Sequence, residues 1–230
     1  MLINLTSVDS TNKYALANLA GLNDRDVVVA ETQTAGRGRL NRRWVSPPGE
    51  NIYCSIVLKN QRPNPLLTIL AALAVAQTIR QSQIDAQIKW PNDIMVNGKK
   101  IGGVLAESNS KGLVIGLGVN VNMSAVAAAQ IDKPATSLKI ETGQAAAKEK
   151  ILQEILEKFF ALYGQVQQEG FAKLLKIWQN ELQIINKKVR VQTAGGEIYG
   201  TVIQIDNDGA LLVETAQGQV RVLAGDVYVA

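Results

Sequence analysis

The spacing of apolar residues changes near Asn186, and this change constrains the fold more than any other feature of the 230-residue sequence. Before it, short apolar runs that suit strands alternate with longer stretches of helical periodicity. After it, short runs of alternating apolar and polar residues are separated by glycine-containing turns, which is typical of small all-β modules. We therefore predict two domains, an α+β domain over residues 1–185 and a small β-barrel over residues 186–230.

The periodicity and the turn residues also predict individual elements. Ser10 or Thr11 can cap a first helix that ends at Gly21, and Asn97-Gly98 marks a tight hairpin. Further helices are expected at 66–81, 145–169 and 171–182, and strands at 27–30, 52–58, 87–90, 94–96, 101–107 and 113–119. The segment 124–143 is expected to be a loop or linker. In the second domain, strands are expected at 189–192, 198–205, 210–214 and 219–223.

Composition excludes many kinds of chemistry. The chain has no histidine, so catalytic triads, histidine bases and histidine metal ligands are all excluded. Its one cysteine, Cys54, can form neither an intramolecular disulfide nor a thiolate zinc site, which favours a cytoplasmic protein. The N-terminus lacks the features of a signal peptide, and the apolar run 66–76 is too short to span a bilayer, so no membrane partner is expected. Any catalysis must use lysine, arginine, carboxylates and backbone amides.

Basic residues are concentrated in one loop. The stretch QTAGRGRLNRRW, residues 33–44, holds four arginines and two glycines, and no acidic residue lies between Glu31 and Glu50. These four charges equal the net charge of the whole chain, so a broad basic surface for nucleic acid is not expected. The loop repels itself and is not expected to be rigid on its own. It is either a solvated basic loop or, as the interleaved glycines favour, an anion clamp for carboxylate and phosphate.

A second polar cluster is Lys89-Trp90-Pro91-Asn92-Asp93. Pro91 cannot continue a central strand, so Lys89 is expected near a strand end, where enzymes often place functional side chains. By spacing alone, an edge lysine followed by an ordinary turn is equally consistent with this cluster. The sequence has no Walker A motif, and its two Gly-x-Gly segments lack the third glycine of a dinucleotide fingerprint.

These clusters belong to a set of segments that, in this order, resembles the biotin protein ligases. The matching segments are Asp9-Ser10-Thr11-Asn12, Glu31-x-Gln33-x-x-Gly36-Arg37-Gly38-Arg39-x-x-Arg42-x-Trp44, Lys89-Trp90-Pro91-Asn92-Asp93, Gly102-Gly103-Val104-Leu105-Ala106-Glu107 and Gly116-x-Gly118-x-Asn120. The C-terminal module resembles the SH3-like domain of that family, so the resemblance covers nearly the whole chain. It implies an α+β fold with a mixed, mostly antiparallel sheet and helices on one side of it, followed by a small SH3-like β-barrel.

The resemblance implies a two-step reaction. Biotin and ATP would give biotinyl-5′-AMP and pyrophosphate with Mg²⁺ present, and the biotinyl group would then pass to a lysine of the biotin carboxyl carrier protein of acetyl-CoA carboxylase. The implied catalytic residues are Lys89, Arg37 and Arg39, to which we add Asp93 as a carboxylate that helps deprotonate the acceptor lysine. Biotin binding is implied for Ser10, Thr11, Asn12, Gln33, Gly36, Arg37, Gly38, Arg39, Lys89, Gly103 and Gly116. Binding of ATP or the adenylate is implied for Arg37, Arg39, Arg42, Trp44, Lys89, Asn92, Gly118 and Asn120. No residue is predicted to bind a metal directly.

Two alternatives stay open. A lipoate or octanoyl transferase of related fold would attach a different acyl group, but the polar side chains of Ser10, Thr11 and Gln33 suit a ureido ring better than an alkyl chain. A nucleic-acid-binding terminal barrel is less favoured, because residues 187–230 hold four basic and five acidic residues. Larger family members carry an N-terminal DNA-binding domain, and with eight residues before Asp9 we expect no DNA binding here. The resemblance also allows a homodimer.

Overall fold

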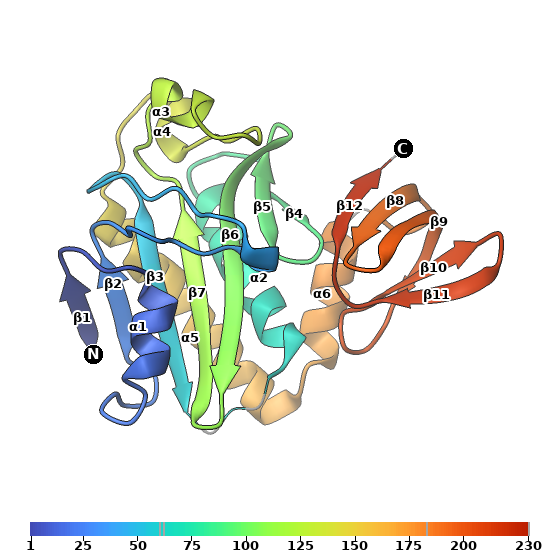
Figure 1. The fold of residues 1–230 in the computed structure, drawn as a ribbon, viewed down its shortest axis with the longest axis horizontal. Helices are drawn as coiled ribbons and strands as arrows, with labels where there is room; N and C mark the ends of the chain where they lie inside the picture. Colours follow the sequence, from blue (N-terminus) through green and yellow to red (C-terminus); the bar gives the residue numbers. More distant parts are fainter. Residues whose placement is uncertain (60, 62, 183, 230) are drawn as a thin grey trace.

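A seven-stranded sheet forms the centre of the first part of the chain. The computed structural model describes residues 1–59, 61, 63–182 and 184–229, with the side chain of Asn41 excluded. The strand order is β1-β2-β3-β7-β6-β5-β4 (Figure 1). The first two strands are parallel and every other neighbouring pair is antiparallel, which confirms the predicted mixed sheet. The strands are β1 (Leu2–Leu5), β2 (Val27–Ala30), β3 (Ile52–Lys59), β4 (Gln87–Lys89), β5 (Asp93–Val96), β6 (Lys99–Asn109) and β7 (Gly112–Val119).

Helices cover both faces of this sheet. Side chains alternate between the two faces of a strand, so neighbouring residues of β3 enter different cores. Ile56 joins the larger core with α2 (Pro65–Arg80), α5 (Lys148–Glu169) and α6 (Ala172–Leu182), whereas Val57 joins a smaller core with α1 (Thr11–Ala17). The expectation of helices on one side was therefore incomplete, because α1 packs on the opposite face (Figure 1).

The central helix α2 follows directly from its sequence. Asn64 caps it by accepting a hydrogen bond from the Leu66 amide at 2.9 Å, and Pro65 occupies the first turn, where a missing amide costs nothing. Every residue from 66 to 76 except Thr68 is buried, which confirms a core helix rather than a membrane span. In the described parts of the chain, no helix combines the length and apolar character needed to cross a bilayer.

Several short elements were not predicted. Strand β1 alternates between exposed and half-buried residues and has no apolar run to reveal it. The segment expected to be a loop contains α3 (Ala125–Ala129) and α4 (Leu138–Thr142), each capped by the side chain of a preceding serine, Ser124 or Ser137. These serines are N-cap signals, but each helix is too short to show periodicity. The first helix also ends earlier than expected, at Ala17 with Asn18 as its C-cap.

The C-terminal segment forms an open, antiparallel five-stranded sheet. Its order is β11-β10-β9-β8-β12, so β11 and β12 are its two edges and no closed barrel is shown. The strands are β8 (Lys188–Thr193), β9 (Gly196–Ile205), β10 (Leu211–Thr215), β11 (Gly218–Val222) and β12 (Asp226–Val229). The four predicted strands exist, but β12 was missed because it has only four residues and follows a short turn. This strand lies on the side that faces the larger sheet (Figure 1).

The two sheets are fixed to each other through a shared core. The buried Trp90 Nε1 donates a hydrogen bond of 2.9 Å to the carbonyl oxygen of Gly209 in the turn before β10. Gly209 has a φ of +86°, and a Cβ there would lie 2.8 Å from Ile69 Cδ1 in α2. Glycine is required at this position by both its backbone conformation and this close approach. The hydrophobic core runs without a break from α2 and α6 into the second sheet.

The packing of α5 yields a stability prediction. Phe159 is fully buried, packs edge-to-face on Phe160 with ring centroids 5.3 Å apart, and stacks on Tyr163. Replacing Phe159 with alanine should lower the free energy of unfolding by about 3–5 kcal/mol, measured by urea unfolding, because it opens a cavity in a close-packed core. The same change at the partly buried Phe160 should cost clearly less. Equal losses at both positions would contradict this packing.

Candidate active site

A cluster of neutral polar side chains lies at the start of α1. Ser10 caps the helix, which leaves Thr11 and Asn12 buried in its first turn. The Thr11 amide donates to Gln33 Oε1 at 2.9 Å, and its hydroxyl lies 3.2 Å from the same oxygen. Gln33 Nε2 in turn donates to Ser46 Oγ at 3.0 Å. The predicted residues Ser10, Thr11 and Gln33 are therefore brought together, with Ser46 as an unpredicted support.

Asn12 connects this cluster to the central strands. Its Nδ2 donates to the Leu105 carbonyl at 3.0 Å and to Glu107 Oε2 at 2.9 Å, and its Oδ1 accepts from Ser55 Oγ at 2.6 Å. The side chain lies directly over Gly116 of β7, where an added Cβ would collide with it. Gly116 is thus needed so that the Asn12 amide can approach the sheet.

Two more glycines form a flat surface beside this cluster. Gly103 of β6 and Gly118 of β7 are paired across the ladder, and the indole of Trp44 lies over both. A Cβ at Gly118 would collide with the indole ring, and one at Gly103 would lie 3.3 Å from it. Trp44 Nε1 is buried and makes no hydrogen bond with any residue that the structure describes. The surface is therefore covered by an aromatic ring whose buried donor has no partner among the described residues.

The Arg/Gly segment, residues 36–43, folds as a hairpin-like lid. Its two ends are joined by a hydrogen bond of 2.9 Å from the Trp44 amide to the Gly36 carbonyl, followed by one of 2.7 Å from Gly38 to Arg42. A single 3₁₀ turn, Arg39–Asn41, forms the tip. A Cβ at Gly36 would lie 2.5 Å from the Trp44 carbonyl oxygen, so this glycine is needed where the two arms meet.

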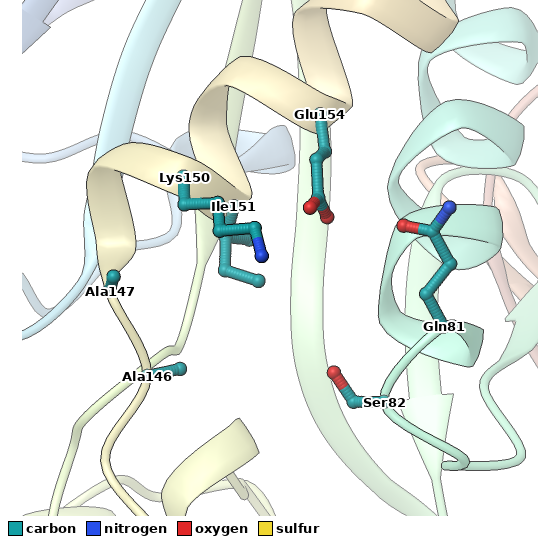
Figure 2. A pocket seen from close by; sticks show the side chains of 7 residues that line it. All are labelled: Gln81, Ser82, Ala146, Ala147, Lys150, Ile151 and Glu154. Atoms are coloured by element: carbon teal, nitrogen blue, oxygen red, sulfur yellow. The ribbon is translucent and has the colours of Figure 1, made fainter.

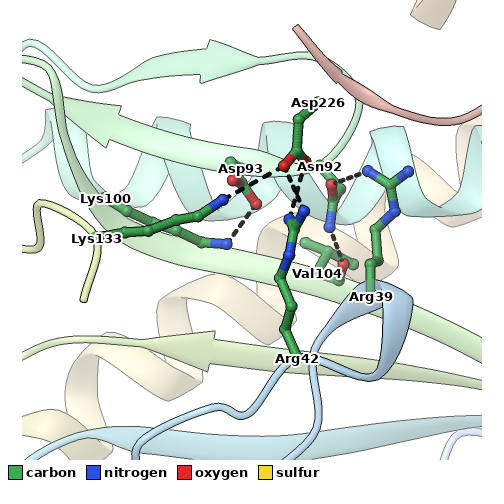
Figure 3. Close-up of polar contacts among 8 residues, drawn as sticks. All are labelled: Arg39, Arg42, Asn92, Asp93, Lys100, Val104, Lys133 and Asp226. Atoms are coloured by element: carbon green, nitrogen blue, oxygen red, sulfur yellow. Dashed lines mark hydrogen bonds and ion pairs between the residues drawn. The ribbon is translucent and has the colours of Figure 1, made fainter. Parts of the chain in front are cut away.

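Three of the four lid arginines have partners in distant segments. Arg37 pairs with Glu107 of β6 at 3.0 Å. Figure 3 shows Arg39, which donates to Asn92 Oδ1 at 2.9 Å. Arg42 forms two hydrogen bonds with Asp226 of β12, of 3.0 and 2.5 Å. Burial lowers the pKa of Arg39 from its usual value, although nearby Asp93 and Asp226 oppose this. The lid repels itself locally, and acceptors from elsewhere in the fold hold it in place.

Lys100 is a cation of this site that the sequence analysis missed. Its ammonium lies 2.5 Å from Asp93 Oδ1 (Figure 3). It also lies 5.3 Å from the centre of the Trp44 ring and beside Gly103. Asp93, expected to act on the acceptor lysine, therefore has one oxygen engaged by Lys100. The sequence does show a local excess of positive charge here, because Lys99 and Lys100 begin β6 just before Gly102 and Gly103.

The predicted residue Lys89 reaches a part of the molecule that was not expected. It ends β4 and is paired with Asp93 across the ladder, which places it at the strand end as predicted. Its ammonium lies 5.0 Å from the centre of the Tyr228 ring in β12, and Arg190 lies 4.5 Å from the same ring. The C-terminal sheet thus contributes an aromatic group beside Lys89.

Two predicted amides act as struts in this structure. Asn92 is buried, donates to the Val104 carbonyl and accepts from Arg39. Asn120 follows β7 and donates to the Thr136 carbonyl at 2.9 Å, which ties it to the segment before α4. Asn92 thus meets β6 in mid-strand next to Gly103, and Asn120 follows the end of β7.

A separate hollow lies away from these residues. It is lined by the end of α2 and the start of α5 (Figure 2), with Gln81, Ser82, Ala146, Ala147, Lys150, Ile151 and Glu154 around it. None of the predicted site residues lines it. The candidate site is therefore the surface under the lid, where neutral donors, glycines and cations converge.

This combination suits an enzyme of the ligase class that joins a carboxylate to a nucleotide and then to an acceptor. The chain belongs to the biotin/lipoate A/B protein ligase family, because its residues 5–124 match the sequence model of that family. Residues 184–229 match the biotin protein ligase C-terminal domain.

Known proteins support this assignment. The chain is 37% identical to the bifunctional ligase/repressor BirA of Bacillus spizizenii, covering 96% of this chain and 71% of that protein. It is 33% identical to the biotin--[acetyl-CoA-carboxylase] ligase of Paracoccus denitrificans, covering 97% and 98%. Its fold matches the biotin protein ligase of Aquifex aeolicus in complex with biotin and ATP, with a TM-score of 0.87 and 28% identity over 100% and 98% of the two chains.

The contact between Asn12 and Gly116 can be tested through stability. Replacing Gly116 with alanine should lower the free energy of unfolding by about 1–3 kcal/mol, because the new methyl displaces a buried, hydrogen-bonded amide. Gly164, in the middle of α5 with open space around it, is the matched control. Alanine there should stabilise the protein by about 0.5–1 kcal/mol through helix propensity. If thermal or urea unfolding shows the Gly116→Ala protein as stable as wild type, the close approach is wrong.

Proposed function

We propose that the site under the lid activates biotin with ATP to give biotinyl-5′-AMP and then transfers biotin to a lysine of the biotin carboxyl carrier protein of acetyl-CoA carboxylase. The observation that carries this proposal is the direct adjacency of a neutral polar cluster and a cationic lid, since Asn12 of the cluster and Arg37 of the lid share the partner Glu107. One part suits an uncharged ureido ring, and the other suits a carboxylate next to a phosphate. The relatives named as biotin ligases agree with it.

The neutral polar cluster is assigned to biotin. Ser10, Thr11, Asn12 and Gln33 offer hydroxyl and amide groups that both donate and accept, as a ureido ring requires. Gly116 lets Asn12 approach the sheet, Gly36 and Gly38 lie in the lid, and Gly103 lies under the Trp44 ring. None of these groups changes charge near neutral pH, so recognition of biotin should depend little on pH.

The cations are assigned to the adenylation step. An oxygen of the biotin carboxylate attacks the α-phosphorus of ATP, and pyrophosphate leaves. Arg37, Arg39 and Lys89 would neutralise the charge that two approaching anions bring together, which is the main barrier to this step. No histidine or protein nucleophile is required, because the substrate carboxylate is the nucleophile. Lys89 would leave the Tyr228 ring to reach the ligand.

The adenylate is assigned to the glycine surface. Trp44 offers its ring and its unpaired Nε1 donor, and Gly118 lets this ring lie flat on the sheet. Arg42 and Asn92 are assigned to the phosphate of the adenylate. Asn120, which follows the end of β7, is assigned to its adenine base. An orphaned buried donor such as this indole nitrogen gains a partner when an acceptor binds.

The transfer step needs a neutral acceptor amine. The amine attacks the acyl carbon of biotinyl-5′-AMP, AMP leaves, and one proton must be removed from the amine. A lysine pKa near ~10.4 makes a nearby carboxylate useful. Asp93 is assigned this role through the oxygen opposite the one that Lys100 engages.

Mg²⁺ is assigned to the nucleotide rather than to a protein cage. Within the described residues, no group of three or more Asp, Glu, Cys or His side chains is placed to hold a metal. Mg²⁺ keeps several waters and commonly binds substrate phosphates. The ion would therefore enter with ATP and add to the positive charge of the lid.

The remaining assignments follow from the family. We place the boundary between the domains at residues 185 and 186 and propose that the C-terminal sheet is an SH3-like module, as its match to the family's C-terminal domain suggests. A cytoplasmic location is proposed from the dependence on ATP and from Cys54, a single free thiol whose pKa burial raises to about 12. Pairing with a second copy and the absence of DNA binding stay predictions, which sedimentation and DNA retention assays would test.

Titration with two ligands separates this proposal from a lipoate or octanoyl ligase. Isothermal calorimetry should show saturable binding of biotin and at least ~100-fold weaker binding of lipoate, because an alkyl chain lacks the polar atoms that a ureido ring offers, and each such hydrogen bond is worth about 0.5–1.5 kcal/mol. Preferential binding of lipoate would overturn the assignment of biotin.

Lys89 can be tested by its effect on adenylation. Replacing it with alanine should slow the formation of biotinyl-5′-AMP by about ten- to a hundredfold, since a charge-assisted bond of roughly 1.5–3 kcal/mol is lost. Formation of the adenylate is measured by rapid quench at saturating ATP. Lys150→Ala, at an exposed lysine beside the separate hollow, is the control and should react at the wild-type rate. A folded Lys89→Ala protein with the wild-type rate would remove Lys89 from the site.

A further inference from the structure

One strand of the C-terminal sheet contacts two functional cations of the first domain. Asp226 and Tyr228 are two positions apart in β12, so their side chains share one face of the strand. Asp226 binds Arg42 of the lid, and Tyr228 covers the ammonium of Lys89. The edge strand β12 therefore borders the site, and the adenylate would lie between two sheets.

The contact of Asp226 is stronger than an ordinary surface pair. Both of its oxygens accept from Arg42, at 3.0 and 2.5 Å, and Lys133 approaches Oδ2 at 3.3 Å (Figure 3). The side chain of Asp226 is 17% exposed. The Arg42 guanidinium, with help from Lys133, holds the pKa of this carboxyl down at about 2. A two-point geometry of this kind fixes the direction of the guanidinium as well as its distance.

We propose that Asp226 is a positioning residue that latches the lid over the bound adenylate by holding Arg42, so that the C-terminal sheet helps retain biotinyl-5′-AMP until the acceptor arrives. This inference rests on the proposed function. The mixed anhydride hydrolyses in water, so a lid that opens early loses the intermediate.

The distribution of lid contacts supports a latch. Arg37 and Arg39 are held by Glu107 and Asn92, which belong to the same domain as the lid. Arg42, in the returning arm, is held from the other sheet. Without Asp226, the returning arm would lose its bidentate anchor, while the first arm would keep both of its contacts. Lid opening would then become easier without a change in the neutral polar cluster at the start of α1.

A neutral isostere and a matched control make the test specific. Asp226→Asn keeps the size of the side chain and removes the charge. Glu181→Gln does the same to the bidentate pair Arg80–Glu181, with distances of 2.9 and 2.8 Å, between α2 and α6. The two carboxylates are almost equally exposed, 17% for Asp226 and 18% for Glu181. Only the first pair touches the lid.

The main measurement is the rate at which preformed biotinyl-5′-AMP leaves the enzyme. Labelled biotinyl-5′-AMP is first formed on the enzyme in a single turnover without an acceptor. Excess unlabelled adenylate is then added, and the release of the label is followed. Asp226→Asn should release it about tenfold faster, equivalent to about 1.4 kcal/mol, while the adenylation rate stays within about twofold of wild type. Glu181→Gln should match wild type in both rates. Unchanged release from Asp226→Asn, or slowed adenylation with unchanged release, overturns the latch.

A double-mutant cycle tests whether Asp226 acts through Arg42. If it does, Asp226→Asn should add little to the release rate of Arg42→Gln. Independent, multiplicative effects would mean that Asp226 acts elsewhere and would overturn the proposal. Raising the salt concentration should also speed release from wild type more than from Asp226→Asn, since one ion pair is already absent in the variant.

Hydrogen exchange separates failure of the latch from failure of the proposed function. Without any ligand, the amides of residues 36–43 should exchange faster in Asp226→Asn than in wild type or Glu181→Gln. Equal exchange in all three proteins counts against the latch whatever the substrate. A wild-type protein that forms no biotinyl-5′-AMP would refute the proposed function, and the exchange result would still decide whether Asp226 holds the lid.

Discussion

The pairing of lid arginines with distant acceptors is the interaction on which the site depends. A segment with four arginines and no acid cannot neutralise itself, so its shape must be imposed from outside. The acceptors come from β6, from the turn after β4 and from β12. The larger sheet therefore holds the first arm and the tip of the lid, and the C-terminal sheet holds the returning arm. A ligand carboxylate or phosphate would enter an environment whose cations are already oriented.

The glycines of the central strands are the counterpart of the lid. In most of the sheet, β-branched and leucine side chains fill both faces, but at Gly103, Gly116 and Gly118 the backbone itself is the surface. Asn12 and Trp44 approach this surface more closely than a methyl group would permit. A strand interior loses packing at each glycine, and here that loss makes room for the Asn12 amide and the Trp44 ring.

Sequence reasoning reached the elements and the motifs but few of the partners. The strand at 113–119 and the helix α2 were predicted because each contains a long apolar run, which is the clearest signal of a buried element. Short elements such as β1, α3 and β12 were missed because periodicity needs more residues than they have. Motif residues such as Thr11 and Gln33 do meet. Asp226, however, lies 184 positions from Arg42, and the sequence contains no local signal that joins them. The expected closed barrel is likewise a matter of strand pairing that spacing alone does not determine.

The central claim is that the site under the lid forms an acyl-adenylate from biotin. Reversible adenylation is measured most directly by isotope exchange between labelled pyrophosphate and ATP on the wild-type protein with Mg²⁺, in the absence of any carrier protein. The account predicts that label enters ATP only when biotin is present and that lipoate does not replace it. Exchange that is independent of biotin, or absent in a folded protein that binds both substrates, would contradict it.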